Sequence, residues 1–213
     1  AIAIGTCGFN HLACQANDSW NQWRGSSRDS QLESADWPDK LDGQLELLWE
    51  NPHQPSYSGP VIHDGRIFTT ETVDKKRERV TAYDLKSGEK LWQTEWEGAM
   101  LVPFFAAANG SWIRSTPICN DNQLIVLGMR DVMVSLDPAT GEQQWKVDFI
   151  ESMGSQLPAF GSVCSPIIDA GAIYVQNGTA VLKLDASTGK LIWKTLEDTS
   201  GMMSSGAFSS PVI

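Results

Sequence analysis

The chain has 213 residues, of which 41% are hydrophobic and 20% charged, a composition typical of a folded globular protein rather than a disordered one. Sixteen Lys and Arg residues against 26 Asp and Glu residues give a formal net charge of −10. This balance argues against nucleic acid as a partner, because binding to phosphates needs a basic surface. The one cationic run, KKRER at 75–79, lies between two strand-like segments and is interpreted as a solvated hairpin tip.

Residues 1–16, AIAIGTCGFNHLACQA, carry no Lys, Arg, Asp or Glu, and they end in a small residue. Such a stretch is typical of the end of a secretory leader. We therefore expect residues 1–16 to be the remnant of a signal peptide and the protein to be exported, to the periplasm or out of the cell. The stretch is too short and too interrupted to span a bilayer, so the protein is not expected to be transmembrane. A lipoprotein acylated at Cys14 is the alternative. The last residues, SSPVI, resemble the start of a strand, so we expect a fragment of a longer protein.

Removal of residues 1–16 would leave two cysteines, Cys119 and Cys164. A pair of cysteines in an exported chain invites a disulfide. However, Cys119 follows Pro117 by two residues and Cys164 precedes Pro166 by two, so the cysteines occupy different depths of equivalent strands. A bridge requires Cα atoms within about 7 Å of each other. We therefore expect two buried free thiols, with a disulfide as the alternative.

Three segments repeat one pattern: TAYDLKSGEKLW at 81–92, VSLDPATGEQQW at 134–145 and LKLDASTGKLIW at 182–193. In each segment an Asp lies four residues before a Gly, and a Trp lies four residues after it. Successive glycines are 53 and 48 residues apart, and such a period is typical of stacked repeats or propeller blades. The repeated positions are Asp84, Gly88 and Trp92, then Asp137, Gly141 and Trp145, then Asp185, Gly189 and Trp193.

Within a repeat, tight turns separate four short strand-like segments. The third repeat reads SPIID, AIYVQ, AVLKLD and KLIWK, with the turns AG, NG and ASTG between them. Asn-Gly is a strong hairpin signal because both residues tolerate positive φ. Four-stranded antiparallel blades repeated along the chain predict an all-β fold, a β-propeller of about three blades and the start of a fourth.

The repeated residues have a structural explanation. The Asp carboxylate is expected to accept backbone N–H bonds from its turn, and the Gly to adopt the left-handed conformation. The Trp falls on the fourth, outermost strand, where it is expected to cover the neighbouring blade. A catalytic acid is usually unique in its chain, so the three copies of the Asp are interpreted as structural.

The repeats AYDLKSGEKLW, SLDPATGEQQW and KLDASTGKLIW resemble the tryptophan-docking motif of the PQQ-like β-propeller family. That family includes pyrroloquinoline-quinone dehydrogenases and the propeller lipoprotein of the bacterial β-barrel assembly machinery. WNQWRGSSRDS at 20–30 is similar to the opening of exported, planctomycete-type members. The resemblance implies an N-terminal segment at 17–44 and a partial propeller at 45–213, in which LELLWENP at 45–52 is a ring-closing outer strand. The expected blades are 53–97, 110–149 and 160–197, and a further blade starts at 205–213.

Two functions follow from the resemblance. Known dehydrogenases of the family carry pyrroloquinoline quinone in the central channel, with a calcium ion and a nearby pair of adjacent cysteines in an early blade. This chain covers the early blades but contains no Cys-Cys pair and no evident group of acid and amide calcium ligands. We therefore expect a non-catalytic propeller that scaffolds protein partners in the cell envelope. A dehydrogenase of the alcohol type, dependent on quinone and calcium, is the alternative.

The repeats differ most in the connections from an outer-strand Trp to the next inner-strand Pro, which run 11, 25, 21 and 18 residues. Such loops lie on one face of a propeller and form its binding surface. The longest contains the candidate binding residues Phe104, Phe105, Trp112 and Arg114, since an Arg beside a Trp can hold a carboxylate and stack on a flat ring. The aromatic residues leave carbohydrate or polymer binding open as a third function, and packing onto their own blade as the structural alternative. No His or Cys cluster has metal-ligand spacing, so no catalytic or metal-ligating residue is predicted.

Overall fold

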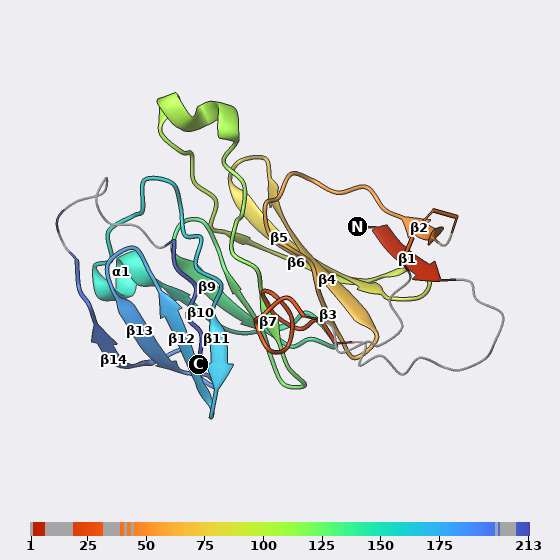
Figure 1. The fold of residues 1–213 in the computed structure, drawn as a ribbon. Helices are drawn as coiled ribbons and strands as arrows, with labels where there is room; N and C mark the ends of the chain where they lie inside the picture. Colours follow the sequence, from red (N-terminus) through yellow and green to blue (C-terminus); the bar gives the residue numbers. More distant parts are fainter. Residues whose placement is uncertain are drawn as a thin grey trace.

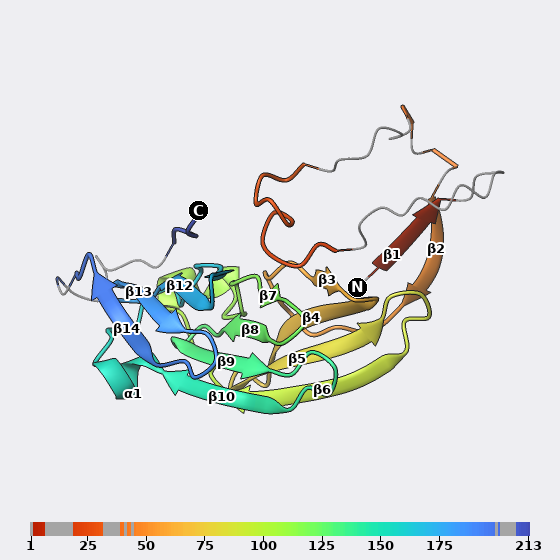
Figure 2. The ribbon, with the colours of Figure 1, turned by 90° about the horizontal axis from the view of Figure 1, so that it is seen from below.

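The computed structural model describes residues 2–6, 19–31, 39–40, 42–43, 45–198, 200 and 208–213. These residues form three four-stranded antiparallel sheets that stand side by side (Figures 1 and 2). In each sheet the strands are paired in chain order, so that every sheet is a meander. The predicted fold is confirmed: the sheets are three blades of a β-propeller.

The first strand of each blade is the shortest, at two or three residues, as expected where the blades converge on the inner side. The first blade consists of β3 Val61–His63, β4 Arg66–Val73, β5 Arg77–Asp84 and β6 Lys90–Glu97. The second consists of β7 Ile118–Cys119, β8 Leu124–Leu127, β9 Val132–Leu136 and β10 Gln143–Asp148. The third consists of β11 Ile167–Asp169, β12 Ala172–Gln176, β13 Val181–Asp185 and β14 Leu191–Thr195.

The middle blade shows why its strands are continuous hydrophobic runs. On β8, Leu124 and Val126 pack in the cluster shared with the first blade, whereas Ile125 and Leu127 pack in the cluster shared with the third. All four side chains are fully buried. A strand that is covered on both faces loses the usual alternation of apolar and polar residues. Burial of each such side chain contributes about 1.5–3 kcal/mol to folding.

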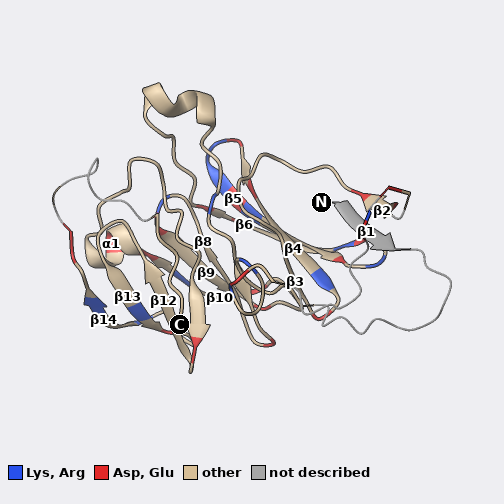
Figure 3. Ribbon diagram, viewed as in Figure 1, with Lys and Arg blue, Asp and Glu red and all other residues tan. Residues whose placement is uncertain are grey.

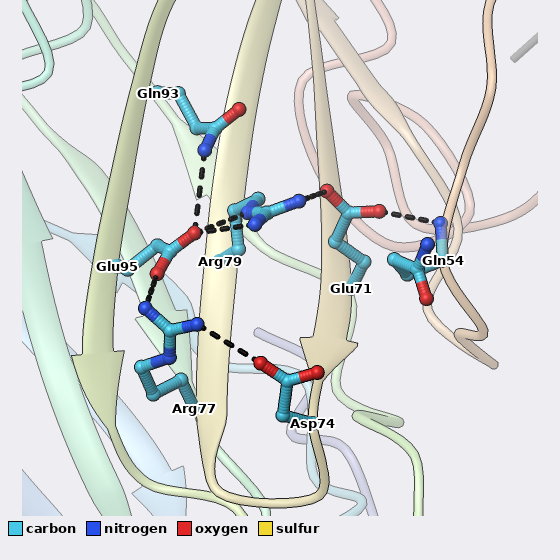
Figure 4. A network of polar contacts seen from close by, with 7 residues as sticks. All are labelled: Gln54, Glu71, Asp74, Arg77, Arg79, Gln93 and Glu95. Carbon is cyan, nitrogen blue, oxygen red and sulfur yellow. Dashed lines mark hydrogen bonds and ion pairs between the residues drawn. The ribbon is translucent and has the colours of Figure 1, made fainter.

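The two faces of the first blade differ in polarity. Phe68, on β4, packs toward the middle blade, but the opposite face carries a network of charged side chains (Figure 4). There the Arg79 guanidinium lies 3.0 Å from the Glu71 carboxylate and 2.5 Å from that of Glu95. The backbone N–H of Gln54 donates to Glu71 at 2.5 Å. This network borders a cavity of about 300 Å³. The carboxylates of Glu71 and Glu95 lie on either side of the Arg79 guanidinium and neutralise its charge.

A two-stranded sheet precedes the blades. β2 Leu45–Glu50 pairs antiparallel with β1 Ile2–Thr6. β1 is the only described part of the predicted leader, whose other residues lie outside the described ones. β2 contacts the first blade as an outer strand would, because Trp49 packs on the turn that follows β5.

Two short helices lie in the connections between blades: η1 Phe104–Asn109 and α1 Phe149–Met153. These connections, residues 98–117 and 149–166, lie on the same side as the turns between the second and third strands of the blades. For example, Ser162 donates its backbone N–H to the carbonyl of Met129 in the β8–β9 turn. We call this side the connector face. The opposite side, which holds the three repeated Asp-to-Gly turns, is the turn face (Figure 1).

Candidate functional site

The repeated Asp residues close the turns of the turn face. In the first blade, Asp84 Oδ1 accepts the backbone N–H groups of Lys86 and Ser87 at 3.0 and 2.7 Å. Equivalent bonds are made by Asp137 and Asp185. Hydrogen bonds from the turn stabilise the ionised carboxylate and hold the pKa of each of these Asp residues below its ordinary value. All three carboxylates are therefore committed to their own turns.

Tryptophans link each outer strand to the turn of the next blade. In three places the indole N–H donates to a backbone carbonyl of that turn, at 3.0–3.1 Å. Trp193, on β14, is 40% exposed, and no further turn of this kind follows it among the described residues. The docked pairs are Trp49 with Leu85, Trp92 with Pro138, and Trp145 with Ala186.

The glycine of each turn is required for two separate reasons. Gly141 has φ +74°, a conformation that disfavours any side chain. In addition, a Cβ atom at this position would lie 2.4 Å from the ring of Trp92. Gly88 lies in the same way beneath Trp49 of β2, and Gly189 lies beneath Trp145 of β10. The repeated motif therefore joins the blades.

Residues 19–31 lie beside the inner strands β3 and β7 (Figure 2), and Arg28 links the segment to the third blade. Trp20 exchanges two backbone hydrogen bonds with Ile62 on β3, at 2.9 and 3.0 Å. Asn21 accepts the backbone N–H of Cys119 on β7, and its side-chain amide donates to the Cys119 carbonyl. The chain itself thus occupies hydrogen-bonding groups that the inner strands would otherwise present to the central channel.

Arg28 fixes the same segment to the third blade. Its guanidinium is only 4% exposed and donates to the carbonyls of Ser165 and Pro166 and to the side chain of Gln22, all at 3.0 Å. The ring of Trp23 covers it at 5.3 Å. Burial lowers the pKa of Arg28, and the fixed fork of donors matches two successive carbonyls. This role of the WNQWRGSSRDS segment was not predicted.

The structure brings together two of the four predicted binding residues. The rings of Trp112 and Tyr57 lie 5.1 Å apart, and the guanidinium of Arg114 lies 5.0 Å from the centre of the Tyr57 ring. Arg114 also donates to the Gly110 carbonyl at 3.1 Å. The cation therefore stacks on Tyr57 rather than on the neighbouring tryptophan, and the cluster joins this loop to the segment that precedes β3.

The other two predicted residues belong to a second aromatic group. Phe104, Phe105, Phe160 and Phe208 form a succession of neighbouring rings, which we call the aromatic ridge. Successive ring centroids are 5.7, 6.2 and 6.4 Å apart. Phe104 is 91% exposed, and Phe105 and Phe208 are each 58% exposed. Phe160 and Phe208 were not predicted, because they lie in two other segments of the chain.

The three chain segments that carry the aromatic ridge contain no charged residue. Residues 98–113, 152–168 and 208–213 contain no Lys, Arg, Asp or Glu, although the chain has a formal net charge of −10. The loop that carries η1 is accordingly free of charged residues in Figure 3. The segments that carry the ridge therefore differ from the neighbouring turns of the connector face, where Asp74, Lys75 and Arg130 are charged.

Two buried acids lie beneath the connector face. Glu78 is fully buried and accepts the backbone N–H of Met129, in the next blade, at 2.8 Å. Burial raises its pKa to about 8. Asp131 is also fully buried and accepts the hydroxyl of Ser155 and the backbone N–H of Gly178, both at 2.8 Å. Burial raises the pKa of Asp131 as well. Both acids therefore bridge adjacent blades.

The two buried acids occupy equivalent positions in the first and second repeats. Glu78 lies six residues before Asp84, and Asp131 lies six residues before Asp137. The third repeat has Thr179 at this position. The interpretation of KKRER as a solvated hairpin tip is correct for Lys75 and wrong for Glu78, because β5 turns the glutamate inward toward the middle blade.

The expectation of two buried free thiols is confirmed. Cys119 and Cys164 are both free and fully buried, and burial raises the pKa of each to about 12. Both thiols therefore remain protonated and unreactive at neutral pH. Among the described residues, no helix is long and apolar enough to cross a membrane.

The described residues do not fit a quinone with calcium on the inner side of these blades. Residues 19–31 cover the inner strands, and the Arg114 guanidinium is already engaged by Tyr57 and Gly110. The described part of the chain also contains no group of three or more His, Cys, Asp or Glu side chains that could hold a metal ion.

The docked tryptophans and four-stranded meanders define the class: a PQQ-like β-propeller. The chain belongs to the family described as outer membrane protein assembly factor BamB, whose sequence profile matches residues 76–213. Among solved structures, quinohemoprotein alcohol dehydrogenase from Comamonas testosteroni is similar, with a TM-score of 0.63 and 17% identity over 84% of this chain and 27% of that one. At this identity the likeness concerns the fold alone.

Two curated proteins are also similar. Polyvinylalcohol dehydrogenase of Sphingopyxis sp. (strain 113P3) is 30% identical over 202 residues, which cover 84% of this chain and 28% of that protein. Serine/threonine-protein kinase AfsK of Streptomyces griseus is 27% identical over 156 residues, 70% of this chain and 17% of the kinase. The chain thus spans less than a third of either relative. Proteins with two different activities contain similar blades, so the blades alone do not define a function.

Proposed function

We propose that the chain is part of an exported, non-catalytic propeller that binds protein partners in the cell envelope. The single observation that carries this proposal is the position of residues 19–31. The backbone of Trp20 and Asn21 bonds to the inner strands β3 and β7, and Arg28 bonds to the two residues directly before β11. A propeller whose channel side is occupied by its own chain has the connector face left for recognition.

Two further observations support the proposal. The family description concerns a factor for assembly of outer membrane proteins, which favours envelope partners. The acids that a catalytic site would need are committed elsewhere: Asp84, Asp137 and Asp185 to turns, and Glu78 and Asp131 to contacts between blades. Export is supported by the uncharged residues 1–16 and by the same family description.

A quinone-dependent dehydrogenase is the second candidate. The similarity to polyvinylalcohol dehydrogenase, at 30% identity over 202 residues, is the observation that favours it. In that case pyrroloquinoline quinone and calcium would be held by parts of the protein outside the described residues. The same relative keeps binding of a neutral polymer open as a third function.

A cofactor titration tests the proposal against the dehydrogenase. Purified full-length protein would be titrated with pyrroloquinoline quinone in the presence and absence of calcium, with tryptophan fluorescence as the readout. We expect no saturable quenching. A quinoprotein alcohol dehydrogenase serves as the positive control, and circular dichroism verifies that the protein is folded. Saturable, calcium-dependent quenching at micromolar quinone would overturn the proposal in favour of the dehydrogenase.

A further inference from the structure

We propose that the aromatic ridge binds an extended, uncharged peptide segment of a partner protein, with apolar side chains at every second position. This inference rests on the proposed function, because it specifies which face of the propeller receives the protein partner and what chemistry the partner presents. The ridge consists of Phe104, Phe105, Phe160 and Phe208.

The ridge is a surface feature with a firm base. Phe160 packs against the buried cluster of Val102, Ala106 and Met129 and so anchors the ridge to the blades. Phe104 and Phe105 project from η1 and remain mostly exposed. Exposed aromatic rings that are grouped rather than scattered are typical of interaction sites. Rings of this type gain binding energy by burial and lose little conformational entropy in doing so.

The spacing of the rings indicates the shape of the ligand. Successive centroids are 5.7, 6.2 and 6.4 Å apart. In an extended peptide, side chains on one face are separated by two residues, or roughly 6.6 Å. Each apolar side chain of such a peptide can therefore meet a successive ring, while the alternate side chains and the backbone remain in water.

The charge and orientation of the ridge argue against other ligands. No charged residue occurs in residues 98–113, 152–168 or 208–213, so these segments themselves offer a charged peptide no ion pair in exchange for its lost hydration. Successive rings are inclined by 82°, 74° and 43° and share no common plane. A rigid, flat sugar ring would find no platform, whereas a flexible chain with separate side chains can follow such a surface.

Binding of designed peptides to the full-length protein tests the inference. The first probe is a fluorescein-labelled peptide of about nine residues, enough to cover the ridge, in which Ser alternates with Leu or Phe. The second has the same composition with the apolar residues placed together. The third replaces Ser by Glu. Fluorescence anisotropy would be measured for the wild type, for Phe104→Ser/Phe105→Ser, and for Leu91→Ser. Leu91 is an exposed apolar residue on β6 and so provides the matched control.

We expect the alternating peptide to bind best and the double substitution to weaken it roughly tenfold, with Leu91→Ser unchanged. Equal binding of the first two peptides, equal binding by the double variant, or no peptide binding would overturn the inference. Binding of polyvinyl alcohol that depends on Phe104 and Phe105, without peptide binding, would overturn it in favour of a neutral polymer. If the peptides fail and the quinone titration is also flat, the binding propeller stands and only this ligand is wrong.

Discussion

On the turn face the blades use the same residues three times, whereas on the connector face each connection is different. The turn face is built from repeated Asp and Gly positions and docked tryptophans. The connector face carries the uncharged aromatic ridge, which draws on three separate segments and has no counterpart from blade to blade. The contrast indicates that repeated residues hold the propeller together, and that its function depends on the residues that are not repeated.

The largest effect is expected from a single methyl group on the turn face. Gly141→Ala forces a side chain into a left-handed conformation and against the Trp92 ring, 2.4 Å away. The backbone strain and the steric clash together are expected to lower the unfolding free energy by about 2–5 kcal/mol. Gly171→Ala is the matched control, since Gly171 has φ +77° but no atom within 4 Å of the added Cβ. We expect a loss of only about 1–2 kcal/mol there. Equal losses in urea denaturation would show that tryptophan docking contributes nothing.

An intermediate effect is expected at the buried glutamate beneath the connector face. Burial raises the pKa of Glu78 from 4.5 to about 8. Between these values the unfolded chain releases a proton that the folded chain retains, so the unfolding free energy falls as pH rises. This contribution is complete below pH 4.5 and is lost as the pH rises through 8. Glu78→Gln has no proton to lose.

When the pH is raised from 5 to 9, we therefore expect the unfolding free energy of the wild type to fall relative to that of Glu78→Gln, by on the order of 3 kcal/mol. Denaturation at both pH values measures the difference. Glu89→Gln, at an exposed position, is the control and should show no such change. A difference between Glu78→Gln and the wild type that is independent of pH would contradict the proposed environment of this carboxyl group.

Much of the fold follows from the sequence because blades are local structures. Each meander pairs neighbouring strands through tight turns, and Asn-Gly or Asp-to-Gly patterns mark those turns directly. The position of residues 19–31 does not follow in this way, because Arg28 bonds to Ser165 and Pro166, more than one hundred residues away. Nothing in the local pattern of either segment specifies such a contact.

In the candidate site, too, some residues could be predicted from the local sequence, whereas others depend on contacts between distant segments. Phe104 and Phe105 could be singled out because they lie in the longest connection. Phe160 and Phe208 could not, since they join the ridge only after three connections meet on one face. Alignment of the repeats would have placed Glu78 and Asp131 at one position, but their burial depends on how the blades pack. Arg114 was predicted beside Trp112, and the ring it stacks on, Tyr57, comes from the segment before the first blade.

The most direct test of the division between the faces is to measure unfolding free energy and peptide affinity together in Phe104→Ser/Phe105→Ser. Both side chains are mostly exposed, so we expect stability to remain within about 0.5 kcal/mol of the wild type. The same variant should lose affinity for the alternating peptide. A variant that keeps its affinity but unfolds more easily would contradict the account, because the ridge would then belong to the packing of the propeller and not to its recognition of a partner.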